Sequence, residues 1–539
     1  MIRVRQVKIK LGEEDNLKGE VAKKLHVKTS EILNVTIVKK SLDARRKDDI
    51  HYVYEVDVEV LSPSKILNKN HSKDIFLAPL EEYKLPPMGK EKLSSRPIIV
   101  GSGPCGLICA YMLAKEGYFP IVIERGEKVE DRMESVSKFW DTGVLNPNSN
   151  VQFGEGGAGT FSDGKLNTMV KDKFFRGKKV FSILVEHGAP PEIMYLQKPH
   201  IGTDLLQDVV KNIRNSIIRL GGEFRYSACL TDIFVQDGKV VGIEINGKEQ
   251  ISCSLLVLAI GHSARDTFSM LYRREVEMKA KPFAVGVRIQ HPQSMIQMSQ
   301  YGTMDSRLPV ADYKLTYTTK KGRGVYSFCM CPGGYVVNAS SEEGRLAVNG
   351  MSYHARDSKN ANSALVVNVT PEDFGTHPLD GVSFQRELEE KAYLYGSGNI
   401  PVQLYDDFRS GIFSTQFGDF LPVMKGSYTF GDLNEILPSF VTDSICEAMP
   451  VFGRRIAGFN RGDAILAGVE SRTSSPVRIL RDDNGEANIK GLYPSGEGSG
   501  YAGGITTAAM DGIKVAEWII GRYLSLIHIS EPTRQEAIS

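Results

Sequence analysis

The amino-acid sequence predicts an α/β protein in which a parallel-sheet domain is interrupted by an inserted α+β domain and preceded by a small α/β domain. Three observations support this fold class. Short apolar runs alternate with helix-like segments from residue 98 to residue 523. The run at residues 255–260 (LLVLAI) is apolar throughout, as is usual in parallel sheets that are covered on both faces. Residues 1–85 contain strands of alternating polarity, which indicate a separate unit.

The composition is that of a globular protein with a large core. The chain has 539 residues, of which 41% are hydrophobic and 24% are charged, and its formal net charge is +1. Because the charges are balanced, neither nucleic acid nor an anionic membrane is expected as the main partner. The oligomeric state is left open.

The cysteines and the N-terminus indicate a reducing, cytoplasmic location. Seven cysteines are scattered without a CxxC pair, so neither a disulfide scaffold nor a metal site is expected. The first residues, MIRVRQVKIKL, alternate in polarity and lack the apolar stretch of a signal peptide. No apolar run reaches the ~18 residues that a membrane helix needs.

Changes in composition divide the chain. The N-terminal unit is expected to contain strands at residues 3–11, 34–39 and 51–61, and a helix at 17–25. The last residues break with the preceding helix pattern and are interpreted as a non-native tail. The expected division is an N-terminal α/β domain at 1–85, a Pro/Gly/Ser/Lys-rich linker at 86–97, the first part of the main domain at 98–261, an inserted substrate domain at 262–460, the C-terminal part of the main domain at 461–523, and the tail at 524–539.

The main domain opens with a nucleotide-binding pattern. The apolar run at residues 98–100 precedes GSGPCG at 101–106, a GxGxxG motif between a strand and a helix. Gly101 permits the tight turn, Gly103 lets the backbone approach a pyrophosphate, and Gly106 lets the helix pack closely on the strand.

The residues after these glycines complete the pattern. The predicted helix starts at Pro104 and ends at Gly117, so its N-terminal N–H groups, including that of Cys105, face the phosphates. The next strand ends in Glu124, 23 residues after the first glycine, where a carboxylate accepts hydrogen bonds from ribose hydroxyls; Arg125 follows it. The pattern predicts a Rossmann-type domain, and it fits both NAD and FAD.

Two later glycine-rich segments favour FAD. Residues 153–166 (FGEGGAGTFSDGKL) suit backbone lying against the ribityl chain and the flavin ring, although an ordinary flexible loop has the same composition. The candidate contacts in this segment are Gly156, Gly157, Ala158, Gly159, Thr160, Ser162 and Lys165.

The second segment, residues 491–519, contains a short strand, a glycine bend and a helix with an apolar face. The N-terminus of such a helix offsets the negative charge of a reduced flavin. The candidate contacts there are Gly496, Glu497, Gly503, Gly504, Ile505 and Thr506, and Gly261 joins them at the end of the apolar run. No second strand–GxGxxG–helix–strand pattern is found, so a nicotinamide nucleotide would bind only transiently.

Several segments in order resemble those of a family of bacterial FAD-dependent dehydrogenases, often described as NAD(P)/FAD-dependent oxidoreductases. They include GSGPCG, FGEGGAGTFSDGKL, KPHIGTD (198–204), LAIGHSARDT (258–267), GVESRTSSPVRI (468–479) and GEGSGYAGGITTAAMDG (496–512). The resemblance extends to about Tyr523. It implies an FAD-binding domain similar to those of the p-hydroxybenzoate hydroxylase and fumarate reductase lineages, with a substrate domain inserted, but no particular substrate.

Three residues are candidates for catalysis. His200 precedes a predicted helix, and in related flavoproteins the matching segment brings a side chain near the flavin, so it is a candidate proton donor. His354, in MSYHARD, is a second candidate, and for both histidines a structural role is an open alternative. Arg472 is favoured among the arginines considered as ligands of an anionic substrate, because serines and threonines surround it. The arginines considered are Arg288, Arg323, Arg345, Arg356, Arg461 and Arg472.

Cys329 and Cys331 form a CxC pair. In a regular strand both thiols would lie on one face. They fit a redox pair, a thiolate that reacts with flavin, or two small buried side chains.

The sequence therefore predicts an FAD-dependent oxidoreductase, a dehydrogenase or reductase that acts on a small-molecule substrate and exchanges electrons with free NAD(P)H. A flavin monooxygenase and an RNA-binding or RNA-modifying flavoprotein are the alternatives.

Overall fold

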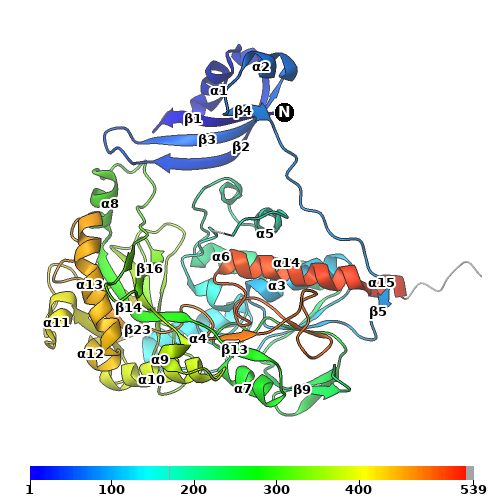
Figure 1. The fold of residues 1–539 in the computed structure, drawn as a ribbon, viewed down its shortest axis with the longest axis vertical. Coiled ribbons are helices and arrows are strands. Elements are labelled where there is room, and N and C mark those ends of the chain that lie inside the picture. Colours follow the sequence, from blue (N-terminus) through cyan, green and yellow to red (C-terminus); the bar gives the residue numbers. More distant parts are fainter. Residues whose placement is uncertain (169, 530–539) are drawn as a thin grey trace, which may run out of the picture.

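The computed structural model describes residues 1–168 and 170–529. An N-terminal domain lies above a larger body, which consists of a nucleotide-binding domain and an inserted domain side by side (Figure 1). Residues 530–539, most of the tail that we interpret as non-native, lie outside the described residues. Within the described residues, the structure contains no helix with both the length and the apolar character to cross a bilayer.

The N-terminal domain is a four-stranded antiparallel sheet with two helices. Its sheet order, β2-β3-β1-β4, and its βαββαβ chain order are those of a ferredoxin-like fold. The valines and isoleucines that alternate along β1 and β3 form its core, including Ile2, Val4, Val56 and Val58. The elements are β1 (Ile2–Lys10), α1 (Leu17–Leu25), β2 (Ile32–Asp43), β3 (His51–Val60), α2 (Pro63–Lys69) and β4 (Ile75–Leu77).

The nucleotide-binding domain is a five-stranded parallel sheet in the order β25-β12-β6-β7-β8. Helices α3 and α14 lie side by side against it (Figure 1), and Gly512 allows this approach because a Cβ there would lie 2.3 Å from the Cys105 carbonyl oxygen. The elements are β6 (Ile98–Val100), α3 (Pro104–Lys115), β7 (Ile121–Ile123), α4 (Val129–Thr142), α5 (Arg176–Glu186), α6 (Thr203–Arg219), β8 (Glu223–Arg225), β12 (Leu256–Leu258), β25 (Leu492–Pro494) and α14 (Ile505–Arg522). A small sheet of β9 (Leu230–Gln236), β10 (Lys239–Ile245) and β11 (Glu249–Ser252) precedes β12.

The inserted domain is built on a seven-stranded sheet in the order β15-β16-β19-β14-β23-β20-β22. Its core is the largest apolar cluster and includes Val287, Leu365 and Phe452. The main elements are β14 (Phe283–Pro292), α8 (Gln293–Tyr301), β15 (Thr316–Thr318), β16 (Gly324–Cys331), β17 (Tyr335–Asn338), β18 (Val348–Met351), β19 (Asn360–Val369), α10 (Asp380–Tyr395), β20 (Ile400–Leu404), β22 (Tyr428–Phe430), α13 (Ser439–Arg455) and β23 (Ile465–Glu470). Helix α7 (Arg265–Arg273) belongs to the nucleotide-binding domain, because its apolar residues pack in one cluster with those of β6 and β12.

The boundary expected at residue 460 differs from the observed one. Strand β23 pairs with β14 and β20, so the inserted domain continues to residue 470. The chain then returns through β24 (Val477–Ile479), which pairs with β13 (Met278–Ala280), to β25. The sequence did not reveal this because ILAGVE is as apolar as a strand of the parallel sheet.

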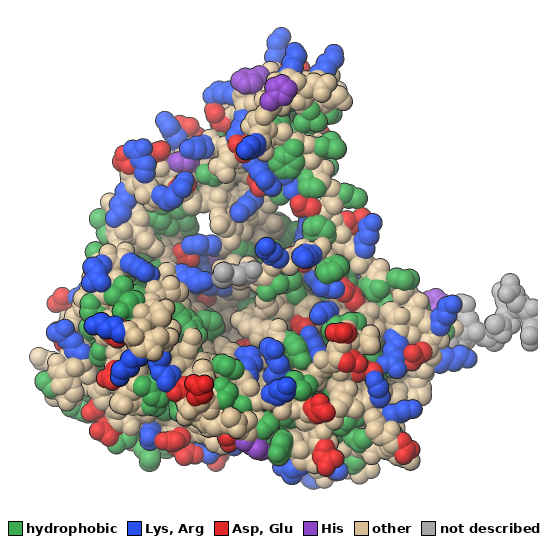
Figure 2. All heavy atoms as spheres, in the orientation of Figure 1, with side chains coloured by type: hydrophobic (Ala, Val, Ile, Leu, Met, Phe, Trp, Pro, Cys, Tyr) green, Lys and Arg blue, Asp and Glu red, His purple; other side chains and the backbone are tan. Residues whose placement is uncertain are grey.

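The N-terminal domain and the linker both form backbone hydrogen bonds with the body. The Lys40 N–H donates to the Tyr195 carbonyl oxygen at 2.7 Å, and the Gln197 N–H donates to the Lys40 carbonyl oxygen at 2.9 Å. The linker strand β5 (Glu91–Lys92) pairs in parallel with β26 (Tyr523–Leu524), which follows α14. Between the N-terminal domain and the body the surface is hollowed, with Lys and Arg side chains on its rim (Figure 2).

Candidate functional site

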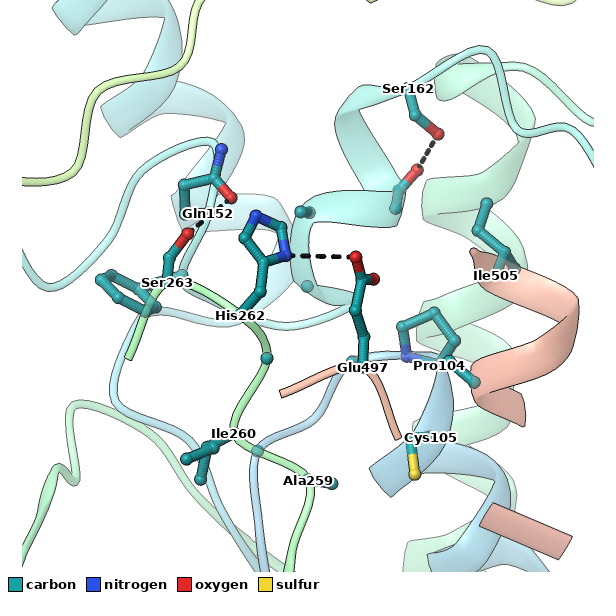
Figure 3. Close-up of a pocket in the computed structure, with 18 of the residues that line it drawn as sticks. Pro104, Cys105, Gln152, Ser162, Ala259, Ile260, His262, Ser263, Glu497 and Ile505 are labelled. Atoms are coloured by element: carbon teal, nitrogen blue, oxygen red, sulfur yellow. Dashed lines mark hydrogen bonds and ion pairs between the residues drawn. The ribbon is translucent and has the colours of Figure 1, made fainter. Parts of the chain in front are cut away.

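A cavity of about 340 Å³ lies where the carboxyl ends of β6, β7 and β12 face the inserted domain. Open α/β sheets bind ligands at this edge. One wall consists of the β6–α3 loop, the segment 157–165 and the start of α14. The opposite wall is formed by the inserted domain and includes Phe328, Asn349 and Thr473. Figure 3 shows side chains of the nucleotide-binding domain around the cavity, among them Pro104, Ser162, His262, Glu497 and Ile505.

Glycines leave the first wall open to a cofactor. A Cβ added to Gly261, Gly503 or Gly504 would meet no atom within 4 Å, and one added to Gly103 would meet only the Gly157 Cα at 3.7 Å. The space that side chains would fill is therefore free for a ligand that approaches the backbone.

Other glycines of the first motif serve the fold. Gly101 has φ +98°, and a Cβ on it would lie 2.3 Å from the Ala259 carbonyl oxygen. A Cβ on Gly106 would lie 1.9 Å from the Gly101 carbonyl oxygen. Gly101 touches the cavity and Gly106 does not.

Two helix N-termini face the cavity. Gly103 is the N-cap of α3 and Gly504 is the N-cap of α14, and neither has a side chain that could cap the helix. The first-turn residues Pro104, Cys105 and Ile505 line the cavity. Free N–H groups and the positive ends of two helix dipoles therefore point to the same space, which suits a diphosphate at one helix and an electron-rich ring at the other.

Glu124 lies in the wall, and its carboxylate also accepts hydrogen bonds from both glycine loops. Its Oε2 accepts from the Ser102 N–H at 2.9 Å and from the Ser102 Oγ at 2.7 Å. Its Oε1 accepts from the Gly126 and Gly154 N–H groups, both at 3.0 Å. The carboxylate thus fastens the first glycine loop to the second, so a ribose at this wall would share an acceptor that is already engaged.

Arg125 also lines the cavity. Its guanidinium lies 4.3 Å from the centre of the Phe153 ring and donates to Asp266 Oδ1 at 2.8 Å. Burial lowers and the Asp266 carboxylate raises the pKa of this guanidinium, with a net rise, so it stays charged. A flat cation on an aromatic ring offers a stacking surface at the edge of the cavity.

His262 and Glu497 meet across the cavity floor (Figure 3). The His262 Nδ1 lies 3.4 Å from Glu497 Oε1, and Ser263 Oγ donates to Gln152 Oε1 at 3.1 Å beside them. The buried Nε2 of His262 and the buried Oγ1 of Thr160 have no hydrogen-bond partner among the described residues. Because buried polar atoms are normally paired and His262 lines the cavity, its free Nε2 indicates a missing polar ligand, whereas Thr160 lies behind the wall.

Arg472 lines the cavity, and a buried carboxylate balances its positive charge. Its guanidinium donates to both oxygens of Glu389, at 2.9 and 2.7 Å, and to the hydroxyls of Ser341 and Ser263. Burial would raise the pKa of Glu389, but Arg265 and Arg472 together hold it far below its usual range. The Arg472 guanidinium therefore holds Ser263 and Ser341 in place, and the Glu389 carboxylate balances its charge.

The two histidine candidates lie outside the cavity wall. Their rings stack 5.2 Å apart, His200 Nε2 is 3.1 Å from the His354 carbonyl oxygen, and His354 Nδ1 is 2.8 Å from the Ile201 carbonyl oxygen. Burial, followed by the Arg356 charge, lowers the pKa of His200 to about 4. The two histidines join the 198–204 loop to the inserted domain, and this role is structural.

Most of the expected cofactor contacts lie in the wall, and some lie behind it. Gly156 is closed off by Thr160 Oγ1, Gly496 by the Cys105 side chain, and Thr506 donates to the Leu166 carbonyl oxygen at 2.6 Å. The wall residues that the sequence did not single out include Gln152, Phe153, Asn167, His262, Ser263 and Glu470. His262 and Ser263 directly follow the apolar run 255–260, so their position after a parallel strand was the available signal.

The open glycine wall, the two helix N-termini and the unpaired His262 Nε2 all fit FAD. Bound there, FAD would supply two-electron transfer.

Comparisons with known proteins agree with this fit. Residues 282–473 match a family described as FAD-dependent protein, C-terminal domain-like, and residues 99–143 match an NAD(P)-binding Rossmann-like domain. Residues 1–59 match a domain of unknown function. A Clostridium beijerinckii protein, described as an uncharacterized protein, is 51% identical over 530 residues, which is 97% of this chain and 99% of that protein.

Solved structures are more distant. Glycine oxidase from Bacillus cereus is 11% identical, over 81% of this chain and 99% of that chain, with a TM-score of 0.35. L-proline dehydrogenase from P. horikoshii is 13% identical, over 82% of this chain and 96% of that chain, with a TM-score of 0.33. The finer similarity to the p-hydroxybenzoate hydroxylase and fumarate reductase lineages stays an expectation. On the matched FAD-dependent domain and the full-length relative, the chain belongs to a family of FAD-dependent oxidoreductases, enzymes with FAD as cofactor, that includes the Clostridium beijerinckii protein.

Proposed function

We propose that the protein is a dehydrogenase or reductase that acts on a small molecule and exchanges electrons with free NAD(P)H. The observation that carries this proposal is the shared cavity, in which the nucleotide-binding loops face the inserted domain with no other element between them. A substrate on the inserted-domain wall would therefore lie against the cofactor, as flavin chemistry requires.

The residues of the first wall would hold the cofactor. The N-terminus of α3, from Gly103 to Cys105, would bind the diphosphate, and that of α14, at Gly504 and Ile505, would face the flavin ring. Glu124 and Arg125 would meet the adenosine end, and His262 Nε2 would gain the partner that it lacks. These groups bind and orient, and FAD carries the electrons.

The charges favour an uncharged substrate. Each of the six arginines considered for an anionic substrate is paired with a carboxylate: Arg288 with Glu470, Arg323 with Asp373, Arg345 with Glu342, Arg356 with Asp163, Arg461 with Asp463 and Arg472 with Glu389. Two further cations lie in the wall: Arg125 is paired with Asp266, and Lys165 donates to the Met330 carbonyl oxygen. A neutral molecule would not have to compete with these pairs.

The donor is tested by anaerobic reduction. We expect NADH or NADPH to bleach the visible absorbance of the purified flavoprotein within seconds. If neither nucleotide bleaches a flavin that dithionite does reduce, the nicotinamide part of the proposal is wrong while FAD binding stands. Rapid NAD(P)H-dependent oxygen consumption coupled to substrate hydroxylation would identify a monooxygenase instead. Nucleic acid that co-purifies and is released by salt would favour the RNA alternative.

Glu124→Gln tests the adenosine end. The amide nitrogen would face N–H groups in place of a carboxylate oxygen, so at least one of the four hydrogen bonds to the glycine loops is lost. We expect FAD affinity to fall by about 10- to 100-fold, equivalent to about 1.4–2.7 kcal/mol. Titration of the apoprotein with FAD measures this. Glu127→Gln, on the same segment, is the control, and equal affinities in both variants would contradict the assignment.

A further inference from the structure

Cys329 and Cys331 occupy an irregular part of strand β16. The pairing of β16 with β19 shifts register between Phe328 and Cys331, which is the signature of a β-bulge. Cys329 has φ +44°, in the left-handed region that a side chain rarely adopts. The regular alternation of side chains expected for a strand is therefore interrupted at Cys329–Met330–Cys331, where the strand is kinked.

The bend brings both cysteines to one buried cation. The Arg288 guanidinium, fully buried on β14, donates to the Cys329 carbonyl oxygen at 2.9 Å and lies 4.0 Å from the Cys331 Sγ. The Cys331 Sγ in turn donates to the Cys329 carbonyl oxygen at 3.3 Å. Arg288 is held in place by Glu470 at 2.7 Å, on the neighbouring strand β23. Lys165 reaches the same segment through the Met330 carbonyl oxygen.

The two thiols differ in acidity. The side-chain hydrogen bond between the two thiols outweighs the effect of burial and, with the charges of Arg288 and Lys165, lowers the pKa of Cys329. The same hydrogen bond, followed by burial, raises the pKa of Cys331 well above its usual value. The other five cysteines, which all lie in the described part of the chain, have pKa values that burial raises. A thiol of lowered pKa beside a thiol of raised pKa is the combination that thiol–disulfide chemistry uses.

The two thiols also differ in access. Cys329 is partly exposed and lines the cofactor cavity, together with Lys165, Glu470 and Ile505 of the α14 N-terminus. Cys331 is fully buried behind it. A group in the cavity can reach the first sulfur directly and the second only through the first.

We propose that Cys329 and Cys331 form a redox-active dithiol that exchanges two electrons with FAD across this cavity. In one direction, the Cys329 thiolate and the Cys331 thiol lose two electrons and one proton as the S–S bond forms. Oxidised FAD takes up both electrons and that proton, so charge and atoms balance. In the other direction, reduced FAD returns them and the S–S bond breaks. The pair is a second two-electron store beside the flavin, and it depends on FAD binding but not on NAD(P)H as donor.

Reductive titration of the holoprotein tests the proposal. The flavoprotein is first oxidised with ferricyanide, then desalted and titrated anaerobically with dithionite. We expect wild type to take up about four electrons per FAD, and Cys329→Ser and Cys331→Ser about two, because each two-electron centre counts separately. Cys253→Ser, a buried cysteine outside the cavity wall, is the control and should take up about four. Flavin content and absorbance verify that each variant has folded. Two electrons in wild type with a fully reduced flavin would overturn the proposal.

Thiol trapping provides a readout that does not involve the flavin. When the oxidised protein is unfolded in an alkylating agent, we expect two fewer alkylated cysteines than the seven in the chain, and all seven after prior reduction. Mass spectrometry should find the two unmodified sulfurs in the peptide that carries Cys329 and Cys331. Two alkyl groups on that peptide from oxidised protein would overturn the proposal, whatever the outcome with NADH or NADPH.

Discussion

Gly103→Val should yield folded protein without FAD. The Gly103 φ of −70° suits any residue, so the substitution introduces no backbone strain. The new Cβ would lie 3.7 Å from the Gly157 Cα, and the two methyl groups would fill the space at the α3 N-terminus between the glycine loops. Because the cofactor phosphates need that space and its N–H groups, we expect FAD affinity to fall by about 100-fold or more, equivalent to at least about 2.7 kcal/mol.

The measurement is the ratio of flavin to protein after purification, together with the melting temperature of the apoprotein. Gly106→Ala is a contrasting control, because its Cβ would lie 1.9 Å from the Gly101 carbonyl oxygen. That substitution should lower the melting temperature of the apoprotein itself, which Gly103→Val should leave nearly unchanged. Stoichiometric FAD in the Gly103→Val protein would contradict the placement of the diphosphate.

Glu389→Gln should be the most destabilising single polar substitution in the inserted domain. The Glu389 carboxylate is fully buried and bonds two buried guanidiniums, those of Arg265 and Arg472. A neutral amide would leave these cations without sufficient counter-charge. Breaking a buried ion pair in this way costs about 3–5 kcal/mol. We expect a corresponding fall in the denaturant midpoint of the domain that contains α10.

The loss of stability caused by Glu389→Gln should become smaller at low pH. The folded-state pKa of Glu389 is depressed, so its stabilising contribution is complete above the unfolded value of about 4.3 and is lost as pH falls toward the folded value. The difference in the free energy of unfolding between wild type and Glu389→Gln should therefore decrease as the pH falls below ~4. Glu390→Gln, the adjacent and half-exposed partner of Arg345, is the control and should cost at most about 1 kcal/mol. Equal losses in the two variants would rule out the buried-pair explanation.

The parts of the site that follow from local chain geometry could be predicted from the sequence. A strand, three glycines at fixed spacing and a helix form one kind of turn, so the sequence could predict the tight turn at Gly101, the close helix packing at Gly106 and the open space at Gly103. The helix start at Gly504 was found for the same reason. Glu124 was placed correctly in the wall, but its four hydrogen bonds to the loops come from residues up to 30 positions away and have no signature in the motif.

The parts that depend on the insertion could not be predicted. Phe328, Glu470 and Arg472 reach the cavity through the order of strands in a seven-stranded sheet, which composition does not determine. The same non-local pairing explains why β23 was assigned to the wrong domain. His200 and His354 are 154 residues apart, and only the folded chain reveals that they stack on each other rather than face the cavity.

The interrupted order of the parallel sheet has a consequence for biosynthesis. β12 ends at residue 258 and its neighbour β25 begins at residue 492, and α14, whose start lies in the cofactor wall, comes later still. At about 5–20 residues per second, a ribosome needs roughly 12 to 47 s to make the intervening chain. The first half of the cofactor site is therefore made well before the second half, and the inserted domain is made in between. The cofactor site is therefore complete only after α14 has been made, and FAD can contact both helix N-termini only from that point on.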